Sequence, residues 1–197
     1  MTQPELGKNL RAARLRLGRS LAEVAAATGV SPSFISMVEN GNSDISIGRL
    51  LRLTQNYGVE IGEVVPGPGP VKEEVVRADR RQSLALKSEG LEIHFLTDTQ
   101  LPLRPLLVEF APGGGMIEPV RDSGDAFLYL LRGEIVVEVD DLAPVVLREG
   151  DSVYLPGAKG RLYRNETTAP ALLLSVVLRQ DVVGNGILDP MKAAVAG

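Results

Sequence analysis

In the first 65 residues, apolar positions recur every three or four residues. Leu6, Leu10, Ala13 and Leu17 would share one face of a helix that ends at Gly18. The same spacing, bounded by residues that cap helices, predicts four further helices. They run from the capping box of Ser20 and Glu23 to Gly29, from the N-cap Ser31 to about Asn40, from the N-cap Ser46 to about Gly58, and from about Glu60 to Val65. This part of the chain therefore predicts a bundle of five short helices.

After residue 70 the pattern changes to short runs rich in Val and Leu, separated by turn residues. The expected strands are Val75–Leu86, Leu91–Thr97, Leu103–Phe110, Phe127–Val139, Val145–Leu155, Arg161–Asn165 and Ala171–Leu178. No helical pattern intervenes, which favours an antiparallel sandwich or barrel.

Pro66-Gly67-Pro68-Gly69-Pro70 divides the two patterns, because alternating Pro and Gly can neither continue a helix nor join the interior of a sheet. We therefore expect a multi-domain α + β chain. Its parts are a helical domain at 1–65, a linker at 66–74, a domain of antiparallel strands at 75–181 and a C-terminal tail at 182–197.

Composition narrows the chemistry. The 197 residues contain no Cys and one His, which excludes disulfides, Cys-ligated metal sites and sites that need several imidazoles. The longest apolar run, 171–178, is far too short to cross a bilayer, and Met1 leads into a polar segment without the features of a secretory signal. We expect a cytoplasmic protein without a membrane partner.

The net charge of −4 is unevenly distributed. Residues 1–65 carry seven Lys and Arg against six Asp and Glu, whereas the remaining residues carry 14 against 19. Five of the seven N-terminal bases lie between Lys8 and Arg19. A local basic stripe of this kind steers a domain toward phosphates whatever the total charge.

The segment from Ser20 to Gly41 has the spacing of a DNA-binding motif. Counting from Leu21, a small residue stands fifth (Ala25), a glycine ninth (Gly29) and a branched apolar residue fifteenth (Ile35). These positions allow two helices to cross closely around a tight turn. Residues 5–65 resemble the phage-repressor (XRE-type) helix-turn-helix family, with the recognition helix after Ser31.

This resemblance implies a homodimer that binds a palindromic operator in double-stranded DNA through the major groove. The residues at base-reading positions are Pro32, Ser33, Ser36 and Met37. The expected phosphate contacts are Arg19, Asn40 and the helix amides behind Ser20 and Ser31. None of these four side chains can form two hydrogen bonds to one base, as Arg, Gln or Asn can. We therefore expect sequence recognition to depend partly on the shape of the DNA. Arg14 and Glu39 match an internal salt bridge of the family. The alternative is a helical bundle that binds only protein.

Residues 72–180 resemble a cupin, a double-stranded β-helix barrel. Residues 150–156 run from Gly to Pro and are followed by Asn165, as in the second cupin motif. However, Arg161 stands at the position of a metal-binding His and Ala126 at that of a metal-binding Glu. The positions of the first motif's HxH pair (Pro119 and Arg121, or Val120 and Asp122) carry no imidazole. A cupin metal normally needs about three imidazoles and a carboxylate. We therefore expect no metal, no cofactor and no catalytic residue here.

A cupin without metal still encloses a pocket in which a small anionic metabolite could bind Arg161. The expected pocket residues are Glu118, Arg121, Tyr129, Arg161 and Tyr163. Arg161 could instead pair with a neighbouring acid, and His94 is expected to be a hydrogen-bonded structural residue.

Three hypotheses for function follow. The favoured one is a sequence-specific transcriptional regulator whose cupin domain senses a small molecule, dimerises the chain, or both. The second is a cupin that serves only as a structural dimerisation module. The third, an enzyme with isomerase- or epimerase-like activity, is disfavoured because the metal ligands are absent and the one His is poorly placed.

Overall fold

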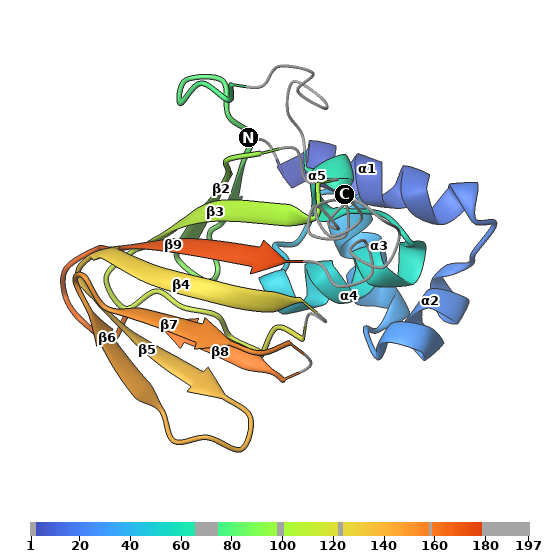
Figure 1. Cartoon of the computed structure of the whole chain (residues 1–197). Helices are drawn as coiled ribbons and strands as arrows, with labels where there is room; N and C mark the ends of the chain where they lie inside the picture. Colours follow the sequence, from blue (N-terminus) through green and yellow to red (C-terminus); the bar gives the residue numbers. More distant parts are fainter. Residues whose placement is uncertain (1–2, 66–74, 98–100, 122–123, 158, 179–197) are drawn as a thin grey trace, which may run out of the picture.

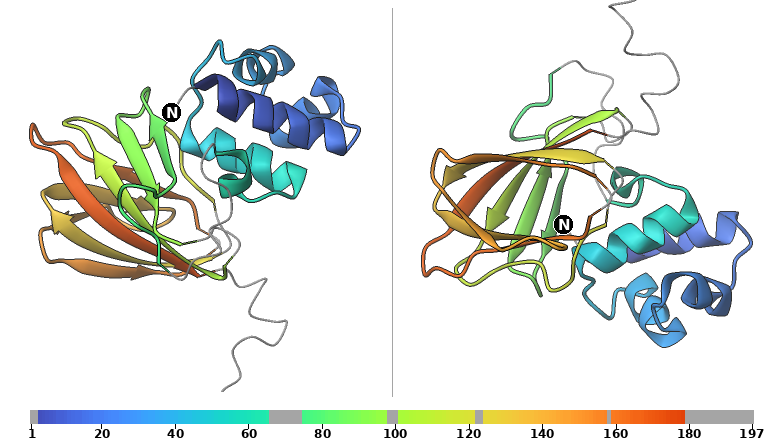
Figure 2. Two further views of the ribbon diagram at one scale, coloured as in Figure 1. Left: turned by 90° about the horizontal axis from the view of Figure 1, so that it is seen from above. Right: turned by 60° about the horizontal axis from the view of Figure 1, so that its bottom comes forward.

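The computed structural model describes residues 3–65, 75–97, 101–121, 124–157 and 159–178. The expected linker at 66–74 and tail at 182–197 lie outside these residues. The described chain forms a helical domain and a domain of antiparallel strands, and the two pack directly against each other (Figures 1 and 2).

The helical domain contains the five expected helices. They are α1 (Gln3–Arg16), α2 (Leu21–Thr28), α3 (Pro32–Glu39), α4 (Ile47–Tyr57) and α5 (Ile61–Val64). The hydroxyls of Ser20, Ser31 and Ser46 accept the backbone N–H three residues later and so cap α2, α3 and α4. The expected caps are therefore confirmed.

Helices α2 and α3 are bent by 115° relative to each other, an angle typical of a helix-turn-helix. Gly29 has a φ of 70°, which lets the chain leave α2 in the left-handed conformation. Ile35 fills the space between the helices and is fully buried. Among the described residues, no single helix is long and apolar enough to cross a membrane; α2 and α3 meet that criterion only when taken together.

The described part of the second domain contains nine strands. They are β1 (Ser83–Leu86), β2 (Leu91–Phe95), β3 (Leu103–Phe110), β4 (Asp125–Arg132), β5 (Glu134–Val139), β6 (Val145–Arg148), β7 (Ser152–Leu155), β8 (Arg161–Arg164) and β9 (Ala171–Leu178). Two expected strands are each divided in two, at Gly133 and at Gly150, where φ values of 85° and 88° break the extended backbone. The first expected strand is shorter because a turn joins Arg77 and Arg80.

The strands form two antiparallel sheets, with the orders β1-β2-β3-β9-β4-β7 and β6-β5-β8. Isolated bridges join Gly115 to Arg164 and Val120 to Arg161. The predicted combination of a helical and an antiparallel domain is confirmed, whereas the predicted closed barrel is not seen in the described residues. The turn at Gly150 places β6 and β7 in different sheets, so the hydrogen-bonded ladder does not close.

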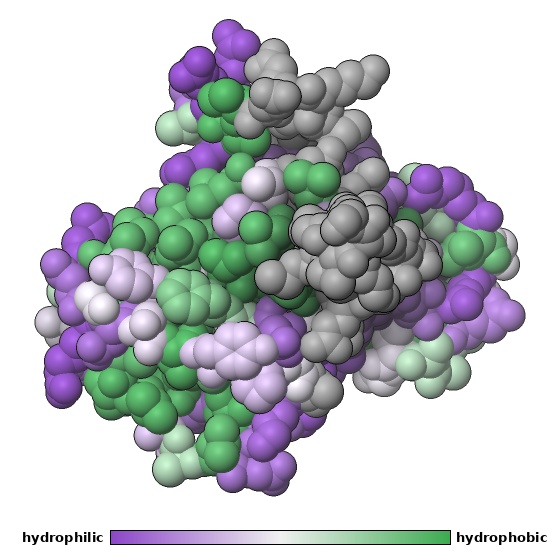
Figure 3. All heavy atoms as spheres, in the orientation of Figure 1, coloured by the Kyte–Doolittle hydropathy of each residue, from purple (hydrophilic) through white to green (hydrophobic). Residues whose placement is uncertain are grey.

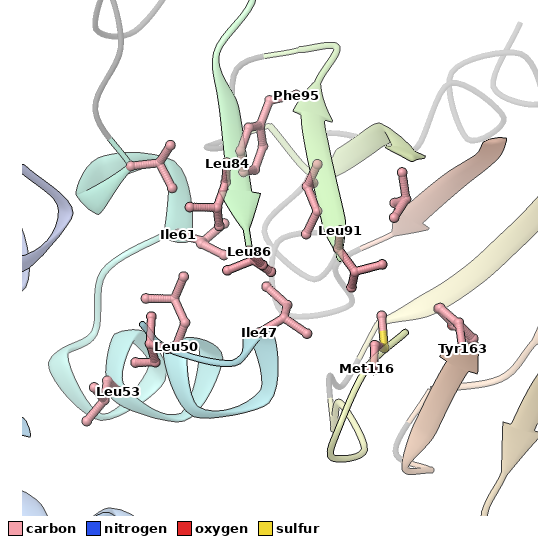
Figure 4. Packing of buried hydrophobic residues seen from close by; sticks show 14 of the residues in the cluster. Ile47, Leu50, Leu53, Ile61, Leu84, Leu86, Leu91, Phe95, Met116 and Tyr163 are labelled. Atoms are coloured by element: carbon pink, nitrogen blue, oxygen red, sulfur yellow. The ribbon is translucent and has the colours of Figure 1, made fainter. Parts of the chain in front are cut away.

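The hydrophobic core continues from one domain into the other. Ile47 of α4 and Ile61 of α5 point toward Leu84 and Leu86 of β1 (Figure 4). All four side chains are less than 9% exposed and belong to one cluster of buried residues. The helical domain is therefore packed against the sheets through α4 and α5, which leaves α2 and α3 on its outer side (Figure 2).

Candidate functional site

The candidate base-reading residues lie on an open surface of α3. Pro32 and Ser33 are exposed, Met37 is 46% exposed, and Ser36 is partly exposed. The Ser33 and Ser31 hydroxyls lie 3.3 Å apart. The strand domain packs on α4 and α5 and leaves this surface uncovered, so the helix is free to enter a groove.

The candidate phosphate-binding residues are held by local hydrogen bonds. Arg19 donates to the side-chain and backbone oxygens of Asn56, at 2.7 and 3.2 Å. The exposed Asn40 donates to the Ser36 carbonyl at 2.8 Å. At Ser20, the Glu23 carboxylate accepts both the backbone N–H and the hydroxyl, and these hydrogen bonds lower the pKa of Glu23. A phosphate at this end of α2 would therefore meet a negative charge.

Arg14 and Glu39 form the expected internal salt bridge. Arg14 donates to both carboxylate oxygens of Glu39, at 2.7 and 2.8 Å, and both side chains are less than 10% exposed. The hydrogen bonds to Glu39 raise the pKa of Arg14. Arg14 is consequently removed from the basic stripe, whereas Lys8, Arg11 and Arg16 remain exposed on α1.

A cavity of about 110 Å³ lies at the boundary of the two domains. It is lined by Ile47, Leu51 and Ile61 of the helical domain and by Ile93, Phe95, Arg104, Leu106, Val108, Met116, Val120, Arg161, Tyr163, Ser175 and Val177 of the strand domain. Figure 4 shows Ile47, Met116 and Tyr163 directed toward the same region. The lining is thus mostly hydrocarbon, with two guanidinium groups and two hydroxyl-bearing residues.

Of the five expected pocket residues, Arg161 and Tyr163 line this cavity, and Glu118, Arg121 and Tyr129 do not. Tyr129 points outward from β4, in the same direction as the exposed Phe127. Arg121 is exposed and pairs with Asp140 at 2.6 Å. Glu118 contacts the helical domain instead. Strand register and interdomain packing decide these orientations, and the sequence pattern left both open.

Arg104 is a cavity residue that the sequence analysis did not identify. It lies on β3 two residues before Leu106 and four before Val108, so strand alternation places all three on one face. Its guanidinium donates to the carboxylate of Glu60, the N-cap residue of α5, at 2.9 Å. Arg161 is 4% exposed and donates to the Gly124 carbonyl. The two arginines bring positive charge to an otherwise apolar wall.

Carboxylates of the strand domain hold the start of α4. Glu89 is 2% exposed and accepts the N–H groups of Ile47 and Ile117, at 2.8 and 3.0 Å. Burial raises the pKa of Glu89, although these two N–H donors lower it. Glu118 accepts hydrogen bonds from Ser46 and, at 2.7 Å, from Arg52. No local sequence pattern indicates these contacts between α4 and the strand domain, because Glu89 lies 42 positions from Ile47 and Glu118 lies 72 positions from Ser46.

Two of the cupin-motif residues, Asn165 and Ala126, contribute to the structure of the strand domain. Asn165 donates to the carbonyls of Ala111 and Ala169, at 3.1 and 2.7 Å. Ala126 is buried in β4 and offers no ligand atom. His94 lies 3.1 Å from Glu109, in agreement with the expected hydrogen-bonded histidine. The His94 ring and the carboxylates of Glu92 and Glu109 each offer an atom that could bind a metal ion, and these atoms lie within 4.8 Å of one another. None of the three residues lines the cavity.

Comparisons with known proteins match both domains. A helix-turn-helix family model matches residues 10–64 and a cupin-domain model matches residues 106–177. The chain is 26% identical over 137 residues to the HTH-type transcriptional regulator PuuR of Escherichia coli (strain K12), an alignment that covers 68% of this chain and 74% of PuuR.

A solved structure with the same fold supports this match. The crystal structure of an HTH_3 family transcriptional regulator from Vibrio cholerae aligns with a TM-score of 0.70 at 18% identity, covering 90% of this chain and 97% of that one. Hydroxypropylphosphonic acid epoxidase from S. wedmorenis aligns with a TM-score of only 0.47 at 21% identity, over 90% and 98% of the two chains. The chain therefore contains a helix-turn-helix domain of the phage-repressor (XRE) type followed by a cupin domain, the domain combination of a transcriptional regulator.

Proposed function

We propose that this transcriptional regulator binds a palindromic operator as a homodimer in the cytoplasm and responds to a small organic anion bound in the interdomain cavity. The observation that carries the ligand proposal is the cavity itself, which combines an apolar lining with Arg104 and Arg161. Its described lining residues include neither a carboxylate nor an imidazole, which supports binding without a metal or a catalytic step.

The outer face of the larger sheet supports the homodimer. Pro105, Val176, Phe127 and Tyr154 form one cross-strand row over β3, β9, β4 and β7. Leu107, Leu174 and Tyr129 form the row beside it. Figure 3 shows apolar residues gathered over this face. We propose a second copy of the chain as the occupant, because one apolar face can pair with itself across a twofold axis and a palindrome needs two recognition helices.

The first prediction concerns this face. Replacing Phe127 and Tyr129 by lysine should weaken dimerisation at least a hundredfold, because two central aromatic anchors are lost and charges are introduced. Sedimentation velocity at micromolar concentration measures the change from dimer to monomer. Leu142→Lys, at a residue 58% exposed in a turn away from this face, is the control. A monomeric parent protein would contradict the proposed dimer.

The second prediction concerns operator recognition. Ser33→Ala and Met37→Ala should each change the preferred base at one position of a selected operator, by roughly 1–3 kcal/mol of discrimination. Arg19→Ala should weaken binding to all sequences and reduce the salt slope by about one. Fluorescence anisotropy at several salt concentrations measures both effects, with the exposed Ser88→Ala in the strand domain as control. Equal affinity for selected and random DNA would contradict sequence-specific regulation.

The third prediction concerns the ligand. In a panel of anionic metabolites, at least one should raise the melting temperature, because a ligand that binds only the folded state stabilises it. Arg161→Ala should abolish this shift, whereas Arg148→Ala, at an exposed arginine of β6, should preserve it. Chelators should have no effect. One tightly bound metal ion per chain would contradict the proposal, and His94→Ala would then test the group with Glu92 and Glu109. A panel without any shift would favour the second hypothesis, a purely structural dimerisation domain.

A further inference from the structure

The interdomain cavity is smaller than a typical metabolite site. Its volume is about 110 Å³, whereas pockets that enclose small organic ligands usually measure about 300–1,000 Å³. A ligand with more than a few non-hydrogen atoms can therefore enter only if one wall of the cavity moves.

The walls differ in how they are held. Ile93 and Phe95 of β2 and Leu106 and Val108 of β3 belong to a continuous antiparallel ladder, whose displacement would break a series of backbone hydrogen bonds. The opposite wall consists of α4 and α5, which the strand domain holds by apolar contacts and by separate polar contacts: Glu60 binds Arg104, Glu89 accepts the Ile47 N–H group, and Glu118 accepts hydrogen bonds from Ser46 and Arg52. The helical wall is consequently the one that can move at the lower cost in free energy.

Arg104 connects the cavity to this movable wall. Its side chain lines the cavity and its guanidinium binds the carboxylate of Glu60 at the start of α5. Both side chains are only partly exposed, at 14% for Arg104 and 21% for Glu60, so the pair is shielded from water. A ligand carboxylate has the same geometry as the Glu60 carboxylate and can form the same hydrogen bonds with the guanidinium.

We propose that the ligand is an organic carboxylate with a hydrocarbon body, and that it replaces Glu60 at Arg104 and thereby separates α4 and α5 from the strand domain. The hydrocarbon body contacts the apolar lining of the cavity, and the ligand carboxylate takes the position of the Glu60 carboxylate. Ligand binding and docking of the helical domain therefore oppose each other. This inference rests on the ligand site proposed above.

Release of α4 changes DNA binding because Arg49 of α4 contacts the recognition helix α3. The Arg49 guanidinium lies over the ring of Phe34 in α3, 4.7 Å from its centroid, and also binds Glu118 of the strand domain at 3.3 Å. In a dimer held together by the sheets, docked helical domains keep a fixed distance between the two recognition helices. Released domains lose this fixed spacing, so the ligand lowers the affinity for the operator.

The test uses the full chain with hexanoate as the probe and hexanol as its uncharged counterpart. Glu60→Gln removes the competing carboxylate charge, and Glu63→Gln is the matched control on the same short helix. Titration calorimetry should show that Glu60→Gln binds hexanoate at least about fivefold more tightly than the parent protein. Glu63→Gln should bind like the parent, and hexanol should bind weakly to all three.

Interdomain distances provide the second readout. The chain contains no cysteine, so Arg11→Cys and Glu149→Cys place one spin label on each domain without background labelling. Hexanoate should lengthen and broaden the distance distribution, and Glu60→Gln should do so partly without ligand. Equal hexanoate affinity in all three proteins with unchanged distances would overturn the coupling and leave the proposed ligand site intact. No binding of hexanoate to any of them would overturn the ligand class proposed here, while the metabolite panel decides separately on the ligand site.

Discussion

Arg14→Ala is expected to lower the free energy of unfolding by about 3–5 kcal/mol. The Arg14 guanidinium donates to both oxygens of Glu39 and, at 2.7 Å, to the Arg19 carbonyl, so it joins α1 to the end of α3 and to the start of α2. Both charged side chains are buried. Removal of Arg14 leaves the Glu39 carboxylate in the interior without its counter-ion, and the cost of burying that charge then falls on the folded state.

Urea unfolding measures this loss, with Arg16→Ala on the exposed side of the same helix as the control. The double variant Arg14→Met/Glu39→Leu should recover most of the stability, because it removes both buried charges and fills the space with apolar atoms. A loss near zero for Arg14→Ala would contradict this account, since only a solvent-exposed pair contributes so little.

The helical domain could be predicted in detail because its signals are local. Each capping serine and the N–H group it accepts are three residues apart, and Gly29 marks the turn directly between the two helices it joins. The Arg14–Glu39 pair is a longer-range contact, and the family resemblance rather than the spacing predicted it. Local chemistry therefore accounts for the position of the candidate recognition surface on α3.

The strand domain could be predicted only in outline. Val and Leu runs located the strands, but the directions of Tyr129 and Glu118 depend on register and on what packs against each sheet. A closed barrel was expected from the cupin resemblance, and the turn at Gly150 instead sends neighbouring strands into separate sheets. The pairing of β3 with β9 joins residues about 70 positions apart, which no local pattern specifies.

The cavity was incompletely predicted because it belongs to both domains. The Pro-Gly segment favoured two separate units, so the expected pocket contained residues of the strand domain alone. Ile47 and Leu51 lie four residues apart on α4 and Ile61 begins α5, positions that are equally typical of the core of the helical bundle. Their role as a cavity wall follows only from the packing of α4 and α5 on the sheets.

Glu89→Ala is expected to lower the free energy of unfolding by about 1–3 kcal/mol, because the buried Ile47 N–H group loses its acceptor; the partly buried Ile117 N–H group loses its acceptor as well and adds a smaller amount. Ile47 is the first residue of α4, and its N–H has no acceptor within the helix. The Ser46 hydroxyl accepts a hydrogen bond from the Arg49 N–H group, and the Ile47 N–H group donates to the Glu89 carboxylate. The substitution therefore removes the acceptor of one N–H group in the helical domain and of one in the strand domain. It also weakens the contact between the two domains.

The pH dependence of this loss follows from the raised pKa of Glu89. A carboxyl whose pKa is higher in the folded state contributes most below its ordinary pKa, and this contribution falls as the pH rises through the raised pKa. The difference between the parent protein and Glu89→Ala should consequently be larger near pH 4 than at pH 7. Hydrogen exchange should show faster exchange of the Ile47 and Ile117 amides in Glu89→Ala and unchanged exchange in the control Glu149→Ala, at an exposed glutamate of another turn. Unchanged protection of both amides in Glu89→Ala would mean that other acceptors hold α4 to the sheets.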